Sequence, residues 1–271
     1  MKRDDLPALP VRDPVADAAW QRIYNAACAP YRRQGQWPYQ WARGKLARDP
    51  AFRGMLERGD FGTQPRVVDI GCGQGLVAAL LHACATTAAS DWPAAWPPAP
   101  HARAYTGIEL MQRDAERAQA ALHDLPLAPR FVCGDMCSTP LPACDLVVIL
   151  DVLHYVDHAA QLGVLQRVRD ALLQPSDQVR RAGDAPGPGR LLLRVGDAGQ
   201  RKGFAISQWV DRIVTLARGH RGAPTWGRPL AEWRSLLAGL GFADVQAVPM
   251  SQGTPFANVL LVADLNRSHP R

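Results

Sequence analysis

The sequence predicts an α/β fold in which helices cover both faces of a doubly wound, mostly parallel sheet. From Arg66 onward, short runs of apolar and β-branched residues alternate with stretches of helical periodicity, which is typical of βαβ units. Runs such as Leu146–Leu150 are apolar throughout, as expected of strands that are buried on both faces. The chain is therefore expected to form a central sheet, with its helices in two outer layers.

The expected strands and helices alternate along most of the chain. Strands are expected at 66–70, 104–109, 129–133, 144–150, 189–195, 242–248 and 257–263. Helical patterns lie at 75–85, 111–123, 157–173, 204–218 and 229–240. The turn 250–255 between the last two strands is too short for a crossover helix, so these strands should pair antiparallel at one end of the sheet.

The first 59 residues differ in pattern from the rest of the chain. Aromatic and apolar residues recur there at helical spacing, so we expect a helical N-terminal cap at 1–59 and the sheet domain at 60–271. The segments 90–103 and 174–189 are rich in proline or glycine and are expected to be irregular insertions.

Composition narrows the class of protein. The chain has 271 residues, 47% of them hydrophobic, which suits a globular domain with a sizeable core. Its longest apolar runs are too short to cross a bilayer, and acids and prolines stand near its start where a signal peptide would be apolar, so we expect a cytoplasmic protein. The net charge of +6 comes mostly from arginines spread singly, and the densest basic runs are only two residues long, which does not favour a nucleic-acid partner.

The six cysteines lie scattered through apolar segments. This pattern favours reduced and mostly buried thiols over a disulfide framework. No histidine stands at finger-like spacing from them, so we expect no metal site.

A glycine loop, Gly71-Cys-Gly73-Gln-Gly75, joins the first strand to the next helical pattern. Glycine allows positive φ and lets a ligand approach without meeting a Cβ. The N–H groups at the start of the following helix favour an anionic group. On its own, such a loop is also found as a tight turn without a ligand.

Three further strand ends carry polar groups. Glu109 ends the second strand, where a carboxylate can accept two hydrogen bonds from a ribose diol, although it can also be a solvated residue at a helix start. Asp135 and Met136 follow the third strand, where they can bind the edge and face of adenine. The fourth strand leads to Asp151–Tyr155. Because ligands of open α/β sheets bind at the carboxyl ends of strands, these groups should meet in one crevice.

In this order the motifs resemble those of class I S-adenosylmethionine-dependent methyltransferases. The similarity covers roughly residues 60–265. It implies a Rossmann-like sheet of seven strands with an antiparallel final strand. It also implies S-adenosyl-L-methionine as cofactor, with S-adenosyl-L-homocysteine as product.

The resemblance assigns cofactor contacts residue by residue. Asp69 and the glycines Gly71, Gly73 and Gly75 would neighbour the amino-acid end of the cofactor, and Glu109 would bind the ribose. The remaining cofactor contacts are assigned to Asp135, Met136 and Leu150. The spacing from Gly75 to Glu109 is longer than usual for the family, and the insertion at 90–103 accounts for it.

Methyl transfer requires alignment of the acceptor with the methyl group and exclusion of water, and a general base helps when the acceptor is a hydroxyl or an activated ring carbon. His154 is the leading candidate for the base, and the alternative is a structural hydrogen bond only. Asp151 would either contact the amino group of the cofactor or orient His154. Candidate acceptor contacts are Tyr155, Arg194, Trp37 and Trp209.

The N-terminal part also resembles methyltransferases found beside bacterial aryl-polyene pigment pathways. This suggests a small aromatic or polyketide-like acceptor that is methylated at oxygen or carbon, with the N-terminal cap on the substrate side. The oligomeric state does not follow from the sequence.

Three other functions remain as alternatives. An NAD(P)-dependent oxidoreductase would use GxGxxG where this loop has GxGxG, and no hydride-transfer site is evident after Leu150. A nucleic-acid methyltransferase that modifies base amino groups would carry an Asn/Asp-Pro-Pro-aromatic stretch where this chain has Asp151-Val-Leu-His154. A non-catalytic protein that binds the cofactor as a scaffold is the third.

Overall fold

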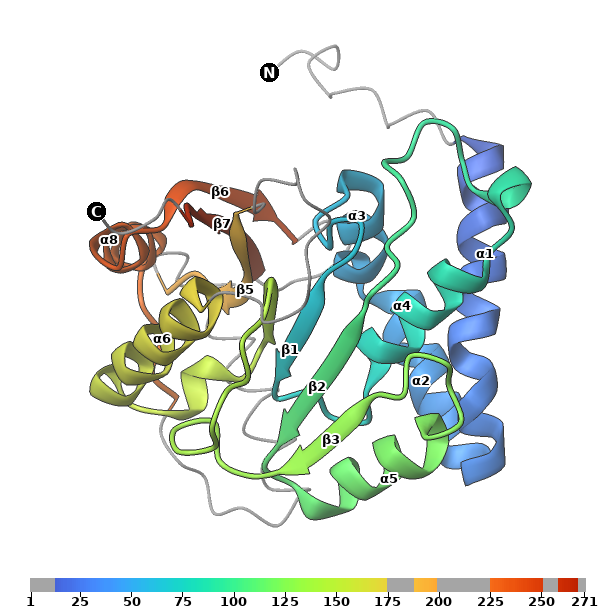
Figure 1. Ribbon diagram of the computed structural model, residues 1–271, viewed down its shortest axis with the longest axis horizontal. Helices are drawn as coiled ribbons and strands as arrows, with labels where there is room; N and C mark the ends of the chain where they lie inside the picture. Colours follow the sequence, from blue (N-terminus) through green and yellow to red (C-terminus); the bar gives the residue numbers. More distant parts are fainter. Residues whose placement is uncertain (1–12, 175–187, 199–224, 251–257, 268–271) are drawn as a thin grey trace, which may run out of the picture.

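The computed structural model describes residues 13–174, 188–198, 225–250 and 258–267. In these ranges the chain forms a seven-stranded sheet in the order β3-β2-β1-β4-β5-β7-β6 (Figure 1). The strands are β1 Arg66–Ile70, β2 Ala104–Glu109, β3 Arg130–Cys133, β4 Leu146–Leu150, β5 Gly189–Gly196, β6 Ala243–Pro249 and β7 Asn258–Leu265. All seven expected strands are present, with small shifts at their ends.

The pairing of the strands matches the predicted topology. β1 pairs parallel with β2 and β4, β2 with β3, and β4 with β5. β7 lies between β5 and β6 and is antiparallel to both, which confirms the antiparallel final strand. The chain order reverses between β1 and β4, and ligands of open α/β sheets bind at the carboxyl ends of strands beside such a reversal.

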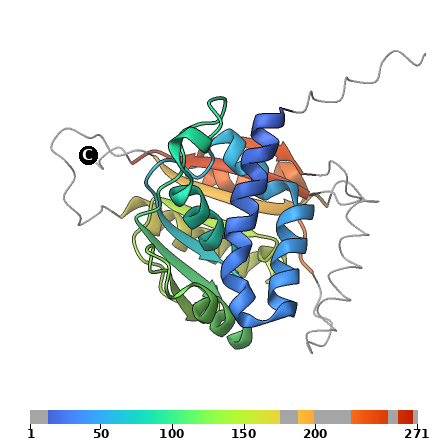
Figure 2. The same ribbon diagram turned by 90° about the vertical axis from the view of Figure 1, so that its right-hand side faces the viewer.

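Helices lie on both faces of the sheet (Figures 1 and 2). One face carries α1 Pro14–Cys28, α2 Gln36–Arg48, α3 Pro50–Arg58, α4 Leu76–Thr86 and α5 Gln112–Leu122. The other face carries α6 His158–Leu173 and α8 Leu230–Gly239. Short 3-10 turns are η1 Ala29–Gln34, η2 Ala89–Asp91 and η3 Leu153–Tyr155. The helix expected at 204–218 lies outside the described residues.

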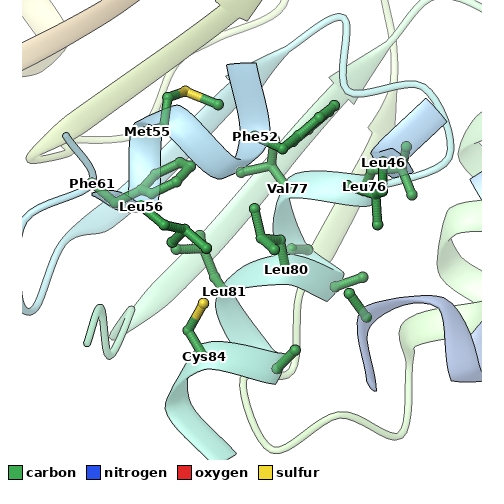
Figure 3. Close-up of a cluster of buried hydrophobic side chains, with 14 of the residues drawn as sticks. Leu46, Phe52, Met55, Leu56, Phe61, Leu76, Val77, Leu80, Leu81 and Cys84 are labelled. Atoms are coloured by element: carbon green, nitrogen blue, oxygen red, sulfur yellow. The ribbon is translucent and has the colours of Figure 1, made fainter. Parts of the chain in front are cut away.

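The N-terminal helices share one apolar core with α4. Side chains of α2 and α3 and of the turn after them pack against the buried face of α4 (Figure 3). The contributing residues are Leu46, Phe52, Met55, Leu56 and Phe61 on one side and Leu76, Val77, Leu80, Leu81 and Cys84 on the other. Because all of them are buried, the N-terminal segment belongs to the core of the sheet domain.

β5 shows how the two-residue period of a strand places charges beside α3. Leu192 lies in the core of the α3 face, whereas Leu191 and Leu193 lie in the core of the opposite face. Arg190 and Arg194 have the same parity as Leu192 and therefore point toward α3. Their guanidinium groups reach the two ends of that helix, at the carbonyl of Asp60 (3.3 Å) and the carboxylate of Asp49 (2.6 Å).

The insertion at 90–103 contains only the end of the short turn η2 and is otherwise irregular, as its prolines predict. It is anchored by Trp96, which is 8% exposed and meets Trp92 edge-on. Most of the second expected insertion, at 175–187, lies outside the described residues. None of the helices in the described ranges is long and apolar enough to span a membrane.

Candidate functional site

The glycine loop follows β1 in the left-handed conformation that glycine favours. Gly71, Gly73 and Gly75 have φ values of 73°, 54° and 78°. A Cβ would lie 2.4 Å from Val152 at Gly71, and 2.8 Å from side chains of the core at Gly75. At Gly73 a Cβ would meet no atom within 4 Å. Two loop glycines thus allow close packing within the protein, and Gly73 borders open space.

Glu109 connects the end of β2 to this loop. Its Oε2 accepts a hydrogen bond from the Gly73 N–H (2.8 Å), and its Oε1 accepts one from the Met111 N–H (2.9 Å). Each carboxylate oxygen can accept a second hydrogen bond, so the half-buried group retains capacity for ligand hydroxyls. Glu109, the residue predicted to bind the ribose, therefore lies beside the open side of Gly73.

Asp69 is buried beneath the loop, with 3% of its surface exposed. Burial raises its pKa to about 7; the charge of Glu109 adds to this shift, and a hydrogen bond from the Tyr105 hydroxyl (2.5 Å) opposes it. Sequence reasoning missed Tyr105. The strand register could have indicated this contact. Gly107 pairs with Asp69 in the parallel register, so Tyr105, two residues earlier, lies on the same face of the sheet as Asp69.

The end of β3 lies next to Glu109, since the N–H of Gly134 donates to the Glu109 carbonyl (2.9 Å). Asp135 is exposed, and its Oδ1 accepts from the Cys137 N–H (2.8 Å) in a local turn. Met136 is half-buried against the core below. Leu110, which the sequence reasoning did not single out, is 61% exposed immediately after Glu109. An apolar side chain in that position adds a surface suited to a flat ring.

The β4 end brings aromatic rings to the same edge of the sheet. Leu150 is half-buried at the end of the strand, and the turn η3 follows two residues later. His154 and Tyr155 both lie in η3, with ring centroids 4.2 Å apart, and Tyr155 is 36% exposed. Trp226 joins them, because its backbone N–H donates to the His154 carbonyl (2.8 Å) while the residue is 40% exposed.

The Arg194 side chain is paired with two carboxylates of the protein, whereas the sequence suggested a contact with the methyl acceptor. It is 3% exposed, and its guanidinium binds both oxygens of Asp151 and the Oδ1 of Asp49 (2.6 Å). Lys45 also pairs with Asp49 (3.0 Å). Asp151 therefore directs its carboxylate to Arg194.

Of the two remaining predicted aromatic contacts, Trp37 lies within the described residues. Trp37 is 59% exposed on α2, beneath the guanidinium of Arg117 from α5 (4.9 Å). Trp209 lies outside the described residues. Tyr31, in the turn η1, is fully buried, and its hydroxyl donates to the Gln74 carbonyl in the glycine loop (2.7 Å).

The sheet order and the polar groups at four adjacent strand ends agree with the fold that the resemblance to class I S-adenosylmethionine-dependent methyltransferases implies. Residues 68–173 match the sequence model of a family described as "Methyltransferase domain". This segment of the chain is therefore similar to a methyltransferase domain, as the order of its motifs predicts. Every candidate cofactor residue lies within the matched segment.

One curated relative is acetylserotonin O-methyltransferase from Mus musculus. It is 35% identical over 114 residues, which is 42% of this chain and 25% of that protein. The matched region thus spans only a quarter of the length of the relative.

Solved structures share the fold over most of the chain. Human N-acetylserotonin methyltransferase in complex with SAM has a TM-score of 0.53 at 18% identity, covering 93% of this chain and 65% of that one. Magnesium protoporphyrin IX methyltransferase (ChlM) from Synechocystis PCC 6803 with bound SAH has a TM-score of 0.52 at 17% identity, covering 91% and 98%. At this level of identity, the likeness confirms the fold.

Proposed function

We propose that the protein is an S-adenosylmethionine-dependent methyltransferase that acts on a small, flat acceptor, aromatic or polyketide-like, at oxygen or carbon. The observation that carries the proposal is the pair formed by Gly73 and Glu109. The open side of the glycine and the adjoining carboxylate offer room and hydrogen-bond acceptors at one point. The names of the relatives, which include an acetylserotonin O-methyltransferase, support the same reaction class.

The residues at the strand ends fit the cofactor. When bound, it supplies a methyl group on a positively charged sulfonium. Glu109 would accept hydrogen bonds from the ribose, and the buried Asp69 would neighbour the amino-acid end of the cofactor, whose ammonium group is cationic. Asp135 and Met136 would contact the adenine, as the motif order predicts, and Leu150 would be a further cofactor contact.

His154 is the residue that we assign as general base. It lies in the turn η3, four residues after the end of β4, and an imidazole nitrogen there can take the proton of an acceptor hydroxyl as the oxygen is methylated. The partly exposed ring of Tyr155 beside it offers a wall against which a flat acceptor can stack.

A methyl-transfer screen tests this function. The full chain would be incubated with methyl-labelled S-adenosylmethionine and a panel of small phenols, other aromatic compounds and polyketide-like acyl compounds, with duplex DNA and RNA as further arms. We expect label on at least one aromatic member. Label on nucleic acid alone would contradict the acceptor class, and S-adenosylhomocysteine binding without transfer to any arm would favour the non-catalytic scaffold.

The Glu109→Ala variant is expected to bind S-adenosylhomocysteine more weakly by about 1–3 kcal/mol, because hydrogen bonds to a charged acceptor are lost. Isothermal titration measures the change. Glu116→Ala is the matched control, since Glu116 lies exposed on α5 and contacts Gln112. Unaltered affinity in Glu109→Ala would reject the ribose assignment.

Cofactor affinity should depend on the ionisation of Asp69. Its raised pKa of about 7 leaves the carboxyl largely protonated in acid, whereas a cationic amino group nearby favours the carboxylate. Binding then releases a proton, so affinity for S-adenosylhomocysteine should rise by up to about tenfold per pH unit below pH 7 and level off above it. Titration at pH 5.5 to 8 measures this slope, and an equal slope in Asp69→Asn would contradict it.

A further inference from the structure

We infer that Arg194 is a positioning residue that ties the turn carrying His154 to the N-terminal helices, through Asp151 on one side and Asp49 on the other. The inference rests on the proposed function for the catalytic role of His154. The link between the segments is itself independent of catalysis.

The first support is the network of ion pairs around Arg194, in which positive and negative charges are equal in number. Two cations, Arg194 and Lys45, face two carboxylates, Asp49 and Asp151. Burial alone would raise the pKa of Asp49, but the charges of Arg194 and Lys45 outweigh it and hold that pKa at about 2. A buried guanidinium is costly unless it is paired, so loss of either carboxylate should disturb the arrangement.

The second support is the backbone of Asp151. This residue has φ of 59°, a left-handed conformation that a side chain with a Cβ rarely adopts without constraint from its surroundings. Arg194 constrains Asp151 through two groups. Its guanidinium binds both carboxylate oxygens of Asp151, and its backbone carbonyl accepts a hydrogen bond from the Asp151 N–H (3.3 Å).

The third support is the contact between this turn and the glycine loop. Val152 lies so close to Gly71 that a Cβ on Gly71 would be 2.4 Å from its Cγ1. His154 follows two residues later. A change in the backbone at Asp151 therefore shifts both the packing against the loop and the position of the imidazole.

On the N-terminal side, specific hydrogen bonds fix the residue that binds Arg194. Asp49 caps α3, with its Oδ1 accepting from the Ala51 N–H (3.1 Å) as well as from Arg194 (2.6 Å). Tyr31 provides a second tie by donating to the carbonyl of Gln74. The N-terminal helices thus hold the glycine loop and the His154 turn at once.

The Arg194→Lys variant tests the inference, with Arg190→Lys as its matched control. Lysine keeps the charge but cannot bind both oxygens of a carboxylate and a second carboxylate in one plane. Arg190 stands on the same face of β5 and also binds both oxygens of a carboxylate, that of Asp264 (2.6 and 2.8 Å), but at the other end of the strand.

We expect Arg194→Lys to lower kcat at least about tenfold while the Kd of S-adenosylhomocysteine changes less than about threefold, as for a misplaced catalytic group. Arg190→Lys should leave kcat within about twofold. Amide hydrogen exchange of the peptide covering 151–156 gives a second readout that needs no acceptor. It should be at least about fivefold faster in Arg194→Lys than in Arg190→Lys or the wild type.

A second pair of variants separates the link from helix capping. Asp49→Asn retains a capping side chain and removes the charge that binds Arg194. Asp13→Asn makes the same change at α1, where Asp13 caps the helix through the Val15 N–H (2.9 Å) ahead of a proline, as Asp49 does. Faster exchange at 151–156 is expected in Asp49→Asn only.

The outcomes distinguish the two proposals. Wild-type exchange at 151–156 in Arg194→Lys overturns the link, whatever the activity. Faster exchange with undiminished kcat leaves the link but overturns the positioning role. If the wild-type protein transfers no methyl group to any acceptor, the proposed function fails while hydrogen exchange still decides the link.

Discussion

The His154→Ala variant is expected to bind S-adenosylhomocysteine as tightly as the wild type and to transfer methyl groups about 10²- to 10⁴-fold more slowly, the usual contribution of a positioned general base. Affinity should be retained because the candidate cofactor contacts lie in the glycine loop and at the ends of β2, β3 and β4, outside the turn η3 that carries His154. The rate should fall because an acceptor hydroxyl would lose the group that takes its proton.

Single-turnover transfer from methyl-labelled S-adenosylmethionine measures this effect, with affinity determined separately by titration. His123→Ala is the control, since His123 is an exposed histidine at the end of α5, next to Asp124. Turnover equal to that of the wild type would remove His154 from catalysis and favour the alternative of a purely structural side chain.

The Gly73→Arg variant is expected to lose cofactor affinity by at least about 100-fold, which corresponds to roughly 3 kcal/mol. The new side chain would occupy the open space beside the loop and approach the Glu109 carboxylate, which is held at 2.8 Å from the Gly73 N–H. The left-handed backbone adds a further cost of roughly 1–2 kcal/mol in stability.

Gly62→Arg separates the two effects. Gly62 also has positive φ (69°), and a Cβ there would meet no atom within 4 Å, but it precedes β1 and lies away from the loop. Both variants should show a similar fall in melting temperature, and only Gly73→Arg should lose affinity in titration. A comparable loss in both would attribute the effect to stability.

The sheet could be predicted because each strand is marked by a local pattern. Continuous apolar runs indicate buried parallel strands, and the turn at 250–255 indicates an antiparallel pair. The meeting of the candidate cofactor residues at one edge could be predicted for a related reason, since polar residues directly after parallel strands lie at the same edge of a sheet. Glu109 and the N–H of Gly73 meet there at 2.8 Å.

The pairing of Arg194 with Asp49 had no comparable signal. The two residues stand 145 positions apart, and the Asp-Pro pair at 49–50 indicates only the start of a helix. Aromatic residues at helical spacing are ambiguous in the same way. Tyr31 is fully buried and Trp37 is 59% exposed, although their sequence contexts are alike.

These long-range contacts connect the N-terminal helices to the candidate site. Through Asp49 they reach the turn that carries the candidate base, and through Tyr31 they reach the loop that would hold the cofactor. Variation in this segment is therefore expected to change the geometry of methyl transfer as well as stability.

Isothermal titration of the full chain with S-adenosylhomocysteine and, separately, with NADH tests the central claim most directly. The Gly73 and Glu109 arrangement predicts saturable binding of S-adenosylhomocysteine and no binding of NADH at the same concentrations. Tight binding of NADH without binding of S-adenosylhomocysteine would contradict the methyl-donor site and favour an oxidoreductase.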